Sequence, residues 1–243
     1  MPTILITGTS RGIGLELARQ YAEAGWQVIA TVRDPTRADR LQALAREYPG
    51  ISVETLDVAE RAQAVELRAR LEGRAIDVLL HNAGIAPGTR EQSTFGSLDY
   101  ELGEVTLRTN LWSVLRITEC LLDNVLRSEQ RKVMVISSAV GTVSSVARFE
   151  GASGGGYLYR ISKAALNMAI ALLAKDLAMR GVTVGLLSPG QVDTDLGGGH
   201  IGTPASQLVP VERSVGGLMA VIESFSLAKT GRFIRHNGAE VPW

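Results

Sequence analysis

Short apolar runs alternate with helix-like segments along the whole chain. Several runs lack polar alternation, which is typical of parallel strands covered on both faces. The expected strands are Thr3–Thr7, Gln27–Val32, Ser52–Leu56, Val78–His81, Lys132–Ser137, Thr183–Leu187 and Arg232–Arg235. The expected helices are Gly12–Ala24, Arg37–Glu47, Glu60–Glu72, Tyr100–Ser128, Tyr157–Arg180 and Val211–Ser224. This alternation predicts an α/β Rossmann fold, with a doubly wound parallel sheet of about seven strands and helices on both faces.

Two long connections stand out in this pattern. Gly141–Gly156 is rich in Gly and Ser, and Gly190–Pro210 contains three consecutive glycines. Both follow expected strands, so we expect both to border a ligand site at the carboxyl ends of the strands. The second is expected to form a mobile, mostly apolar lid carrying Leu196, Ile201 and Leu208. No linker divides the chain, so residues 1–243 are expected to form a single domain.

Composition narrows the possible functions. The 243 residues carry a formal net charge of zero with a pI near 6.9, which argues against a nucleic-acid or membrane-surface binder. Cys120 is the single cysteine and has no partners for a disulfide or a zinc site, so we expect a core thiol and no bound metal. The chain begins directly with a strand-like run and has no apolar stretch of membrane-spanning length. We expect a cytoplasmic protein.

The first expected strand runs into a glycine-rich turn that opens the first helix. Gly8 permits the tight turn, Gly12 allows the backbone to approach a pyrophosphate, and Gly14 allows close packing of helix on strand. The helix N-terminus offers unpaired N–H groups to phosphates. A plain structural turn uses the same residues, but this position between strand and helix favours a dinucleotide site.

The end of the second strand bears on the choice of nucleotide. Val32 stands where an NAD-dependent enzyme usually has a carboxylate, and Arg33 follows it. Arginine is a forked, permanently charged donor suited to a 2′-phosphate, and Arg11 and Ser10 in the first turn offer further donors. Asp34 is evidence to the contrary, although beside a proline it is typical of a turn. Together these residues favour NADP(H) over NAD(H).

Tyr159 and Lys163 lie four residues apart in an expected helix and therefore share one face. Free tyrosine has a pKa near ~10, and a nearby ammonium would lower that pKa by stabilising the phenolate. The pair would then give a proton to a developing alkoxide. A chance surface pair would have the same spacing.

Two further polar residues lie near the expected carboxyl edge. Ser138 follows the fifth strand and can polarise a substrate carbonyl, although neighbouring Ser137 is equally placed by sequence alone. Asn110 lies on or near an apolar stripe and must find partners. It either satisfies backbone groups or holds a water connected to Lys163.

These residues, in this order, resemble the short-chain dehydrogenase/reductase family over essentially the whole chain. Additional matches are Leu56-Asp57-Val58, His81-Asn82-Ala83-Gly84 and Ser188-Pro189-Gly190-Gln191-Val192-Asp193-Thr194. His81 departs from the family's usual asparagine, and the Ser138–Tyr159 stretch is longer than in most members. The segments before Tyr159 and near Trp243 are most similar to the C-factor and sniffer-type carbonyl reductases.

The resemblance implies roles for particular residues. Ser138 would orient the substrate, Tyr159 would be the acid/base, Lys163 would tune it and bind ribose, and Asn110 would support a proton relay. The implied cofactor contacts are Gly8, Ser10, Arg11, Gly12, Ile13, Gly14, Arg33, Asp57, Val58, Asn82, Ala83, Gly84, Tyr159, Lys163, Pro189, Gly190, Val192 and Thr194. Residues 1–130 would mainly bind the dinucleotide, and residues 131–243 would mainly bind substrate and catalyse.

The expected function is NADPH-dependent reduction of a small carbonyl compound. One alternative is an NADPH-binding signalling or redox-sensing protein, which would need only the nucleotide half. Another is a dehalogenase-type relative that has lost the nucleotide site, which the glycine turn, Arg33 and Lys163 oppose. Relatives pair through two long helices corresponding to Tyr100–Ser128 and Tyr157–Arg180, so we expect a homodimer or homotetramer.

Overall fold

The computed structural model describes residues 1–89, 91–147, 155–194, 196 and 208–243, and this part is built on a parallel sheet. Seven strands pair in the order β3-β2-β1-β4-β5-β6-β7. They are β1 Thr3–Thr7, β2 Gln27–Val32, β3 Ile51–Thr55, β4 Val78–His81, β5 Lys132–Ile136, β6 Thr183–Ser188 and β7 Phe233–Arg235. The order reverses at β1, so the crevice between β1 and β4 is the switch point where such sheets bind ligands.

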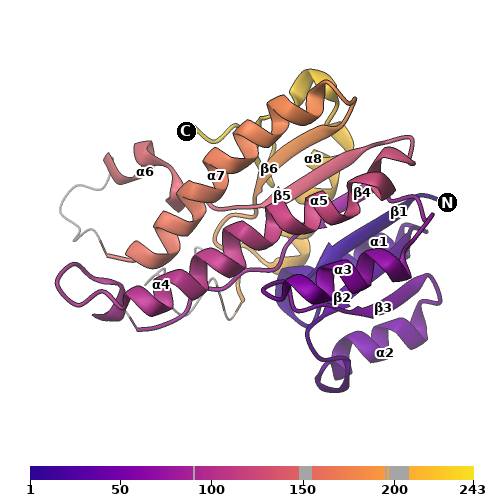
Figure 1. Cartoon of the computed structure of the whole chain (residues 1–243), viewed down its shortest axis with the longest axis horizontal. Coiled ribbons are helices and arrows are strands. Elements are labelled where there is room, and N and C mark those ends of the chain that lie inside the picture. Colours follow the sequence, from indigo (N-terminus) through magenta and orange to yellow (C-terminus); the bar gives the residue numbers. More distant parts are fainter. Residues whose placement is uncertain (90, 148–154, 195, 197–207) are drawn as a thin grey trace.

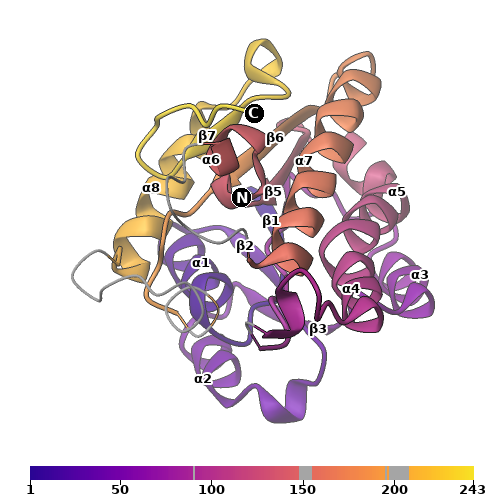
Figure 2. The same cartoon turned by 90° about the vertical axis from the view of Figure 1, so that its left-hand side faces the viewer.

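Helices cover both faces of the sheet, as the sequence predicts. They are α1 Gly12–Glu23, α2 Asp39–Glu47, α3 Arg61–Arg70, α4 Tyr100–Leu107, α5 Ser113–Leu126, α6 Val143–Ala147, α7 Tyr157–Ala178 and α8 Val211–Ser224. Figures 1 and 2 show α3, α5 and α7 on one face and α1, α2 and α8 on the other. The doubly wound α/β fold is therefore confirmed.

The strands other than β3 are apolar without alternation because each of them contributes to two cores. In β1, Leu5 packs in the cluster beneath α3, α5 and α7, whereas Ile4 and Ile6 pack in the cluster beneath α1, α2 and α8. All three side chains are fully buried. Burial of such a side chain contributes roughly 1.5–3 kcal/mol, so a polar substitution on either side of β1 would be costly.

The predicted helix Tyr100–Ser128 is not one continuous α-helix. A π-helical segment, η3 Arg108–Trp112, separates α4 from α5, and α5 ends at Leu126. A π turn inserts one extra residue, so it changes the direction of the side chains within it without ending the rod. Such turns are frequent at functional sites, and this one carries Asn110.

The predicted loop Gly141–Gly156 is partly helical. It follows the 3₁₀ turn η4 Ala139–Gly141 and contains α6, while residues 148–154 lie outside the described part. Most of the predicted lid, including Ile201, also lies outside the described residues. The two ends of the lid meet where Val192 forms a parallel bridge with Val209.

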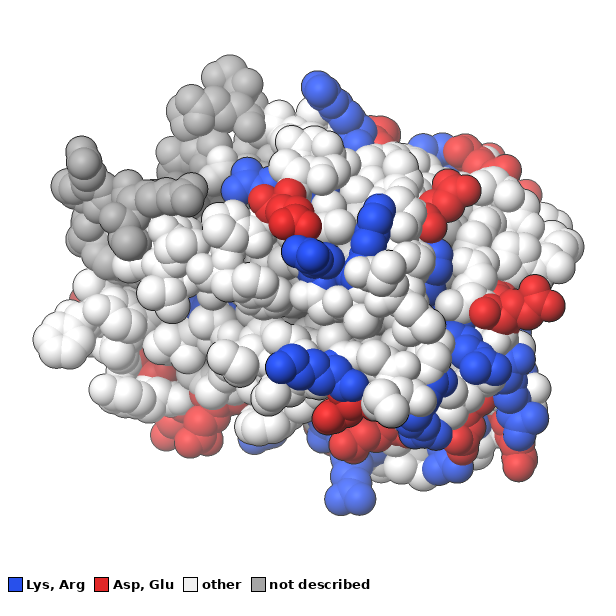
Figure 3. All heavy atoms as spheres, turned by 90° about the horizontal axis from the view of Figure 1, so that it is seen from above, with Lys and Arg blue, Asp and Glu red and all other residues white. Residues whose placement is uncertain are grey.

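Charged side chains of both signs are interspersed on the face seen in Figure 3. Neither sign of charge dominates that face. Within the described residues, no helix is long and apolar enough to cross a membrane.

Candidate active site

The turn after β1 has a shape that only glycine permits. Gly8 has a φ of +73°, and its N–H donates to Thr31 O at 3.1 Å. A Cβ at Gly8 would lie 2.8 Å from Ala83 Cα, and one at Gly14 would lie 2.1 Å from Gly8 O. The backbone therefore forms a cradle at the start of α1. Arg11, the N-cap of that helix, makes no side-chain cap hydrogen bond.

The turn after β4 is bonded to this cradle. The side-chain amide of Asn82 donates to Thr7 O at 3.0 Å and to Gly8 O at 2.9 Å. In return, Thr7 Oγ1 accepts from the backbone N–H groups of Asn82 and Ala83 at 3.0 and 3.1 Å. Asn82 and Ala83 thus lie at the switch point between β1 and β4, where the resemblance expects cofactor contacts.

The residues expected to recognise a 2′-phosphate lie beside the cradle. Ser10, Arg11 and Arg33 are exposed at the carboxyl ends of β1 and β2. Asp34 instead caps the next turn, because its Oδ1 accepts from Thr36 N at 2.9 Å. This arrangement matches the interpretation of Asp34 as a turn residue.

The other expected cofactor contacts lie around the same crevice. Asp57 Oδ1 accepts from Ala59 N at 2.9 Å, which fixes the turn after β3. The side chain of Val58 is buried in the core, so only its backbone can face a ligand. Ile13, just inside α1, is half-buried against the core shared by α1, α2 and α8.

The segment after β6 approaches the cradle from the other side. A Cβ at Gly12 would lie 3.4 Å from Thr194 Cγ2, so this segment passes directly over the glycine turn. Pro189 O accepts from Ser214 Oγ at 2.7 Å, and Val192 is buried. Gly190, with a φ of +82°, lies exposed between them. A backbone-lined cradle with flanking arginines fits a dinucleotide phosphate.

Next to the cradle lies a polar cluster formed by β5 and α7. Tyr159, in the first turn of α7, is half-buried and hydrogen-bonded to Ser138. Lys163, one helical turn later, is buried, and its Nζ lies 5.7 Å from the centroid of the Tyr159 ring. Nζ donates to Ile136 O at 3.1 Å. The pair is therefore not a chance surface pair.

Burial controls the proton affinities of this cluster. It raises the pKa of Tyr159 to about 12, although the hydrogen bond with Ser138 acts in the opposite direction. Burial lowers the pKa of Lys163 to about 8. The sequence predicts a net lowering of the pKa of Tyr159, and this is wrong for this structure, because loss of solvation outweighs the effect of the hydrogen bond with Ser138. Tyr159 is consequently a protonated phenol at neutral pH.

The two serines after β5 have different partners in the structure. Ser137 Oγ donates to Asn167 Oδ1 at 2.5 Å within the buried interior. Ser138 bonds Tyr159 instead. Asn167 was not anticipated from the sequence, although its position four residues after Lys163 places it on the same face of α7.

Asn110, in the π-helical segment, bonds backbone groups near the cluster. Its Nδ2 donates to Ile85 O at 2.8 Å and to Ser162 Oγ at 3.0 Å, and its Oδ1 accepts from Ile85 N at 2.8 Å. Gly84 lies between Asn110 and Lys163, because a Cβ there would be 3.4 Å from Asn110 Oδ1 and 3.7 Å from Lys163 Nζ. This matches the backbone-satisfying interpretation and brings Asn110 into the cluster.

The arrangement combines two chemical capabilities. The cradle and its arginines can hold a dinucleotide, and the cluster can bind a carbonyl oxygen while the Tyr159 phenol donates a proton. Among the described residues, no group of histidine, cysteine, aspartate and glutamate side chains could hold a metal ion.

Similarity to known proteins covers both parts of the site. A model of the short chain dehydrogenase family matches residues 2–200. C-signal of Myxococcus xanthus is 35% identical over 168 residues, which are 69% of this chain and 93% of that protein. The carbonyl reductase Sniffer of D. melanogaster superposes with a TM-score of 0.88 at 28% identity, over 100% of both chains. NADPH-bound carbonyl reductase from chicken fatty liver gives a TM-score of 0.88 at 28% identity, over 100% of this chain and 99% of that one.

Proposed function

The chain belongs to the short-chain dehydrogenase family, and from this premise we propose that it reduces a small ketone or aldehyde with NADPH. That the protein is an oxidoreductase follows from the family; the carbonyl substrate and the preferred nucleotide are our proposals. One observation carries them: Tyr159 is half-buried, is hydrogen-bonded to Ser138, and has Lys163 Nζ 5.7 Å from the centroid of its ring, beside the glycine cradle. A phenol held protonated at neutral pH is the form that a reduction requires.

The proposed reaction moves one hydride and one proton. NADPH, when bound in the cradle, supplies the hydride that goes to the carbonyl carbon. The Ser138 hydroxyl polarises the carbonyl oxygen, and the Tyr159 O–H gives its proton to the same oxygen as the alkoxide forms. The product is the alcohol, and the phenolate left on Tyr159 is stabilised by the nearby Lys163 ammonium. Asn110 holds the backbone of Ile85 beside this lysine.

The preference for NADPH rests on the charges around the cradle. Arg11 and Arg33 are exposed at the ends of neighbouring strands, where the 2′-phosphate of the adenosine ribose would lie. A carboxylate at that place would repel the phosphate. The NADPH-bound reductase from chicken liver, similar over the whole chain, supports the same preference.

Replacing Tyr159 with Phe tests the proposal. The change removes the proton donor while leaving the ring and the cradle in place, so kcat/KM for carbonyl reduction should fall by about 10²–10⁴. NADPH binding, measured by fluorescence titration, should stay within about twofold of wild type. Wild-type protein that oxidises no NADPH across a panel of aldehydes, ketones and diketones would refute the reductase assignment.

A signalling or sensing role is the second candidate, favoured by the similarity to C-signal. It requires nucleotide binding but no proton donor. In a strain lacking this chain, a phenotype restored equally by wild type and by Tyr159→Phe would support the sensor. A phenotype restored by wild type alone would support the enzyme.

We also propose that the chain forms a dimer through α4, α5 and α7. Exposed apolar side chains lie along these helices and the η3 turn between α4 and α5, among them Trp112 of η3 and Met168 and Leu172 of α7, with 57%, 65% and 57% of their surface accessible. The β7 edge of the sheet is less suited to pairing, because Val241 N donates to Phe233 O and Arg235 N to Ala239 O. The chain's own C-terminal segment thus occupies the outer hydrogen-bonding groups of β7.

A further inference from the structure

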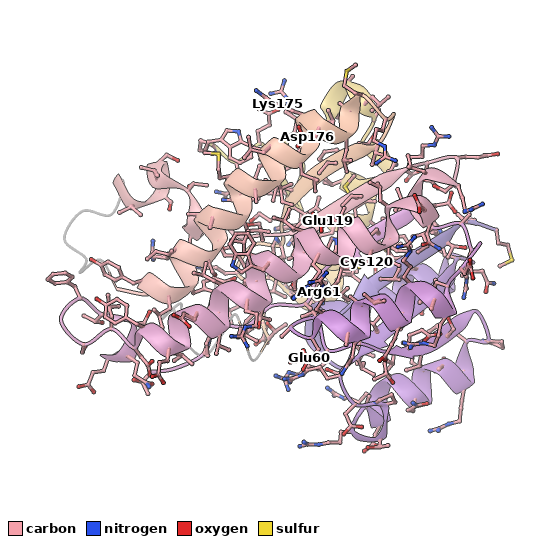
Figure 4. All side chains as sticks on the ribbon, in the orientation of Figure 1. Glu60, Arg61, Glu119, Cys120, Lys175 and Asp176 are labelled. Atoms are coloured by element: carbon pink, nitrogen blue, oxygen red, sulfur yellow. The ribbon has the colours of Figure 1, made fainter. Side chains whose placement is uncertain are left out.

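An arginine behind the crevice connects the outer surface to the turn after β3. Arg116 lies in α5 and lines an open groove of about 700 Å³ between α3 and α5. Figure 4 shows this groove face, with Arg61 of α3 opposite Glu119 and Cys120 of α5. Arg116 belongs neither to the glycine cradle nor to the Tyr159 cluster. Its position raises the question of why a charged residue is directed inward here.

Arg116 points from the groove toward the backbone of the turn. Its Nη2 donates to Val58 O at 3.2 Å and to Ala59 O at 3.4 Å. The same turn is held from other sides, since Asp57 N donates to Gln63 Oε1 at 2.6 Å and Asp57 Oδ1 accepts from Ala59 N. Arg116 thus completes a set of contacts that fixes both the carboxylate of Asp57 and the backbone of Val58.

This placement of Arg116 lowers the stability of the folded state. Arg116 Nε is buried and is one of two buried side-chain polar atoms without a hydrogen-bond partner in the described part of the chain. An unsatisfied buried donor destabilises the fold, and no carboxylate in the described part forms an ion pair with this guanidinium. A residue kept only for packing would serve better as methionine or leucine. The contacts to Val58 and Ala59 therefore point to a functional role.

We propose that Arg116 is a positioning residue for the adenine end of the cofactor. It sets the turn Asp57–Ala59, which follows β3 next to the end of β2, where the adenosine ribose is proposed to lie. The Asp57 carboxylate and the Val58 backbone would meet the adenine ring there. The inference rests on the proposed NADPH binding at this crevice. It assigns to Arg116 no contact with the reacting atoms, so its effect is confined to cofactor affinity and leaves the chemical step unchanged.

The test compares two cofactors in the full-length chain. Arg116→Met keeps the aliphatic packing and removes the donors, so the Kd for NADPH should rise about tenfold. The Kd for reduced nicotinamide mononucleotide, which lacks the adenosine half, should not change. At saturating NADPH, kcat should equal that of wild type. Arg68→Met is the matched control, because Arg68 lines the same groove but makes only an exposed ion pair with Asp123 at 3.5 Å; neither Kd should change.

Each outcome of this test either supports or overturns the proposed role of Arg116. An unchanged Kd for NADPH, or an equal rise for both cofactors, overturns the role of Arg116. Wild-type protein that binds no NADPH refutes the proposed function instead, so the two failures are distinguishable. If Arg116→Met does not fold, Arg116→Lys keeps the charge but loses the fork. A selective rise in the Kd for NADPH then supports the role, and a wild-type Kd overturns it.

Discussion

The two halves of the carboxyl edge are built by different means. Around β1 and β4 the site is a backbone shape, held by contacts such as Asn82 Nδ2 to Gly8 O at 2.9 Å, and it leaves no room for a Cβ at Gly14. Around β5 and α7 the site depends on side chains, and burial of Tyr159 and Lys163 sets their proton affinities. Under the proposed function, nucleotide binding in the first half would depend on backbone geometry, and proton transfer in the second would depend on solvation.

This difference predicts which property each half should lose when a residue in it is substituted. A single atom added to the cradle displaces backbone and should damage folding and nucleotide binding together. A single atom removed from Tyr159 leaves the shape intact and should damage catalysis alone, as proposed above for Tyr159→Phe. The comparison is therefore tested by variants in which folding, nucleotide binding and catalysis are each measured.

The largest effect is expected at Gly14. A Cβ in Gly14→Ala would lie 2.1 Å from Gly8 O and 2.5 Å from Asn82 Nδ2, so the cradle must shift. Overpacking of this kind costs about 1–3 kcal/mol or more, and we expect NADPH binding to fall below detection. Urea unfolding and fluorescence titration measure the two losses.

Gly216 in α8 provides the matched control for Gly14. A Cβ there would meet only Gln20 Oε1, at an ordinary 3.6 Å. Gly216→Ala should stabilise the fold by roughly 0.5–1 kcal/mol through helix propensity and leave NADPH binding unchanged. Wild-type NADPH affinity in Gly14→Ala would contradict the view that backbone shape determines this half.

His81 joins the two halves, because it ends β4 between β1 and β5. Burial lowers its pKa from 6.5 to about 3, and its Nε2 lies 2.9 Å from Thr118 Oγ1. Below pH 6.5 the unfolded chain gains a proton that the native state resists, so stability falls as pH drops toward 3. The contribution of His81 is about 1.4 kcal/mol per pH unit in this window.

The variant His81→Asn should remove that part of the acid slope. Free energies of unfolding measured between pH 7 and pH 4 should converge with those of wild type, or exceed them, as the pH falls. His236→Asn serves as control, because His236 is only partly buried and its pKa is lowered less deeply. Parallel curves for wild type and His81→Asn would show that His81 takes up its proton in the native state.

The sequence predicts the backbone-determined half well. Glycine spacing, the Asn82-Ala83-Gly84 segment and the apolar strands are local signals, and the structure places them where the pattern indicates. The π-helical turn at Asn110 was missed, because helical periodicity does not reveal one inserted residue. Helix α6 was missed as well, since its Ser and Val residues are typical of loops and strands.

The side-chain half was predicted in its members but not in its electrostatics. The spacing of Tyr159 and Lys163 brings them together, yet a spacing carries no information about solvation. Desolvation reverses the expected shift in the pKa of Tyr159. The role of Arg116 was not predicted from the sequence for a related reason: only the fold brings α5 against the turn at Val58.

The smallest effect is expected at the exposed rim of the cradle, where the side chain of Arg33 lies in solvent beside the backbone turn. Arg33→Glu replaces an exposed cation with a carboxylate that repels a 2′-phosphate and can accept from ribose hydroxyls. The ratio of kcat/KM for NADPH to that for NADH should fall by at least about tenfold, equivalent to about 1.4 kcal/mol. Arg37→Glu makes the same charge change one turn further on, at another exposed position, and should alter the ratio by less than about twofold once salt screens it. Equal shifts in both variants would mean that net charge, and not a contact from Arg33, selects the nucleotide.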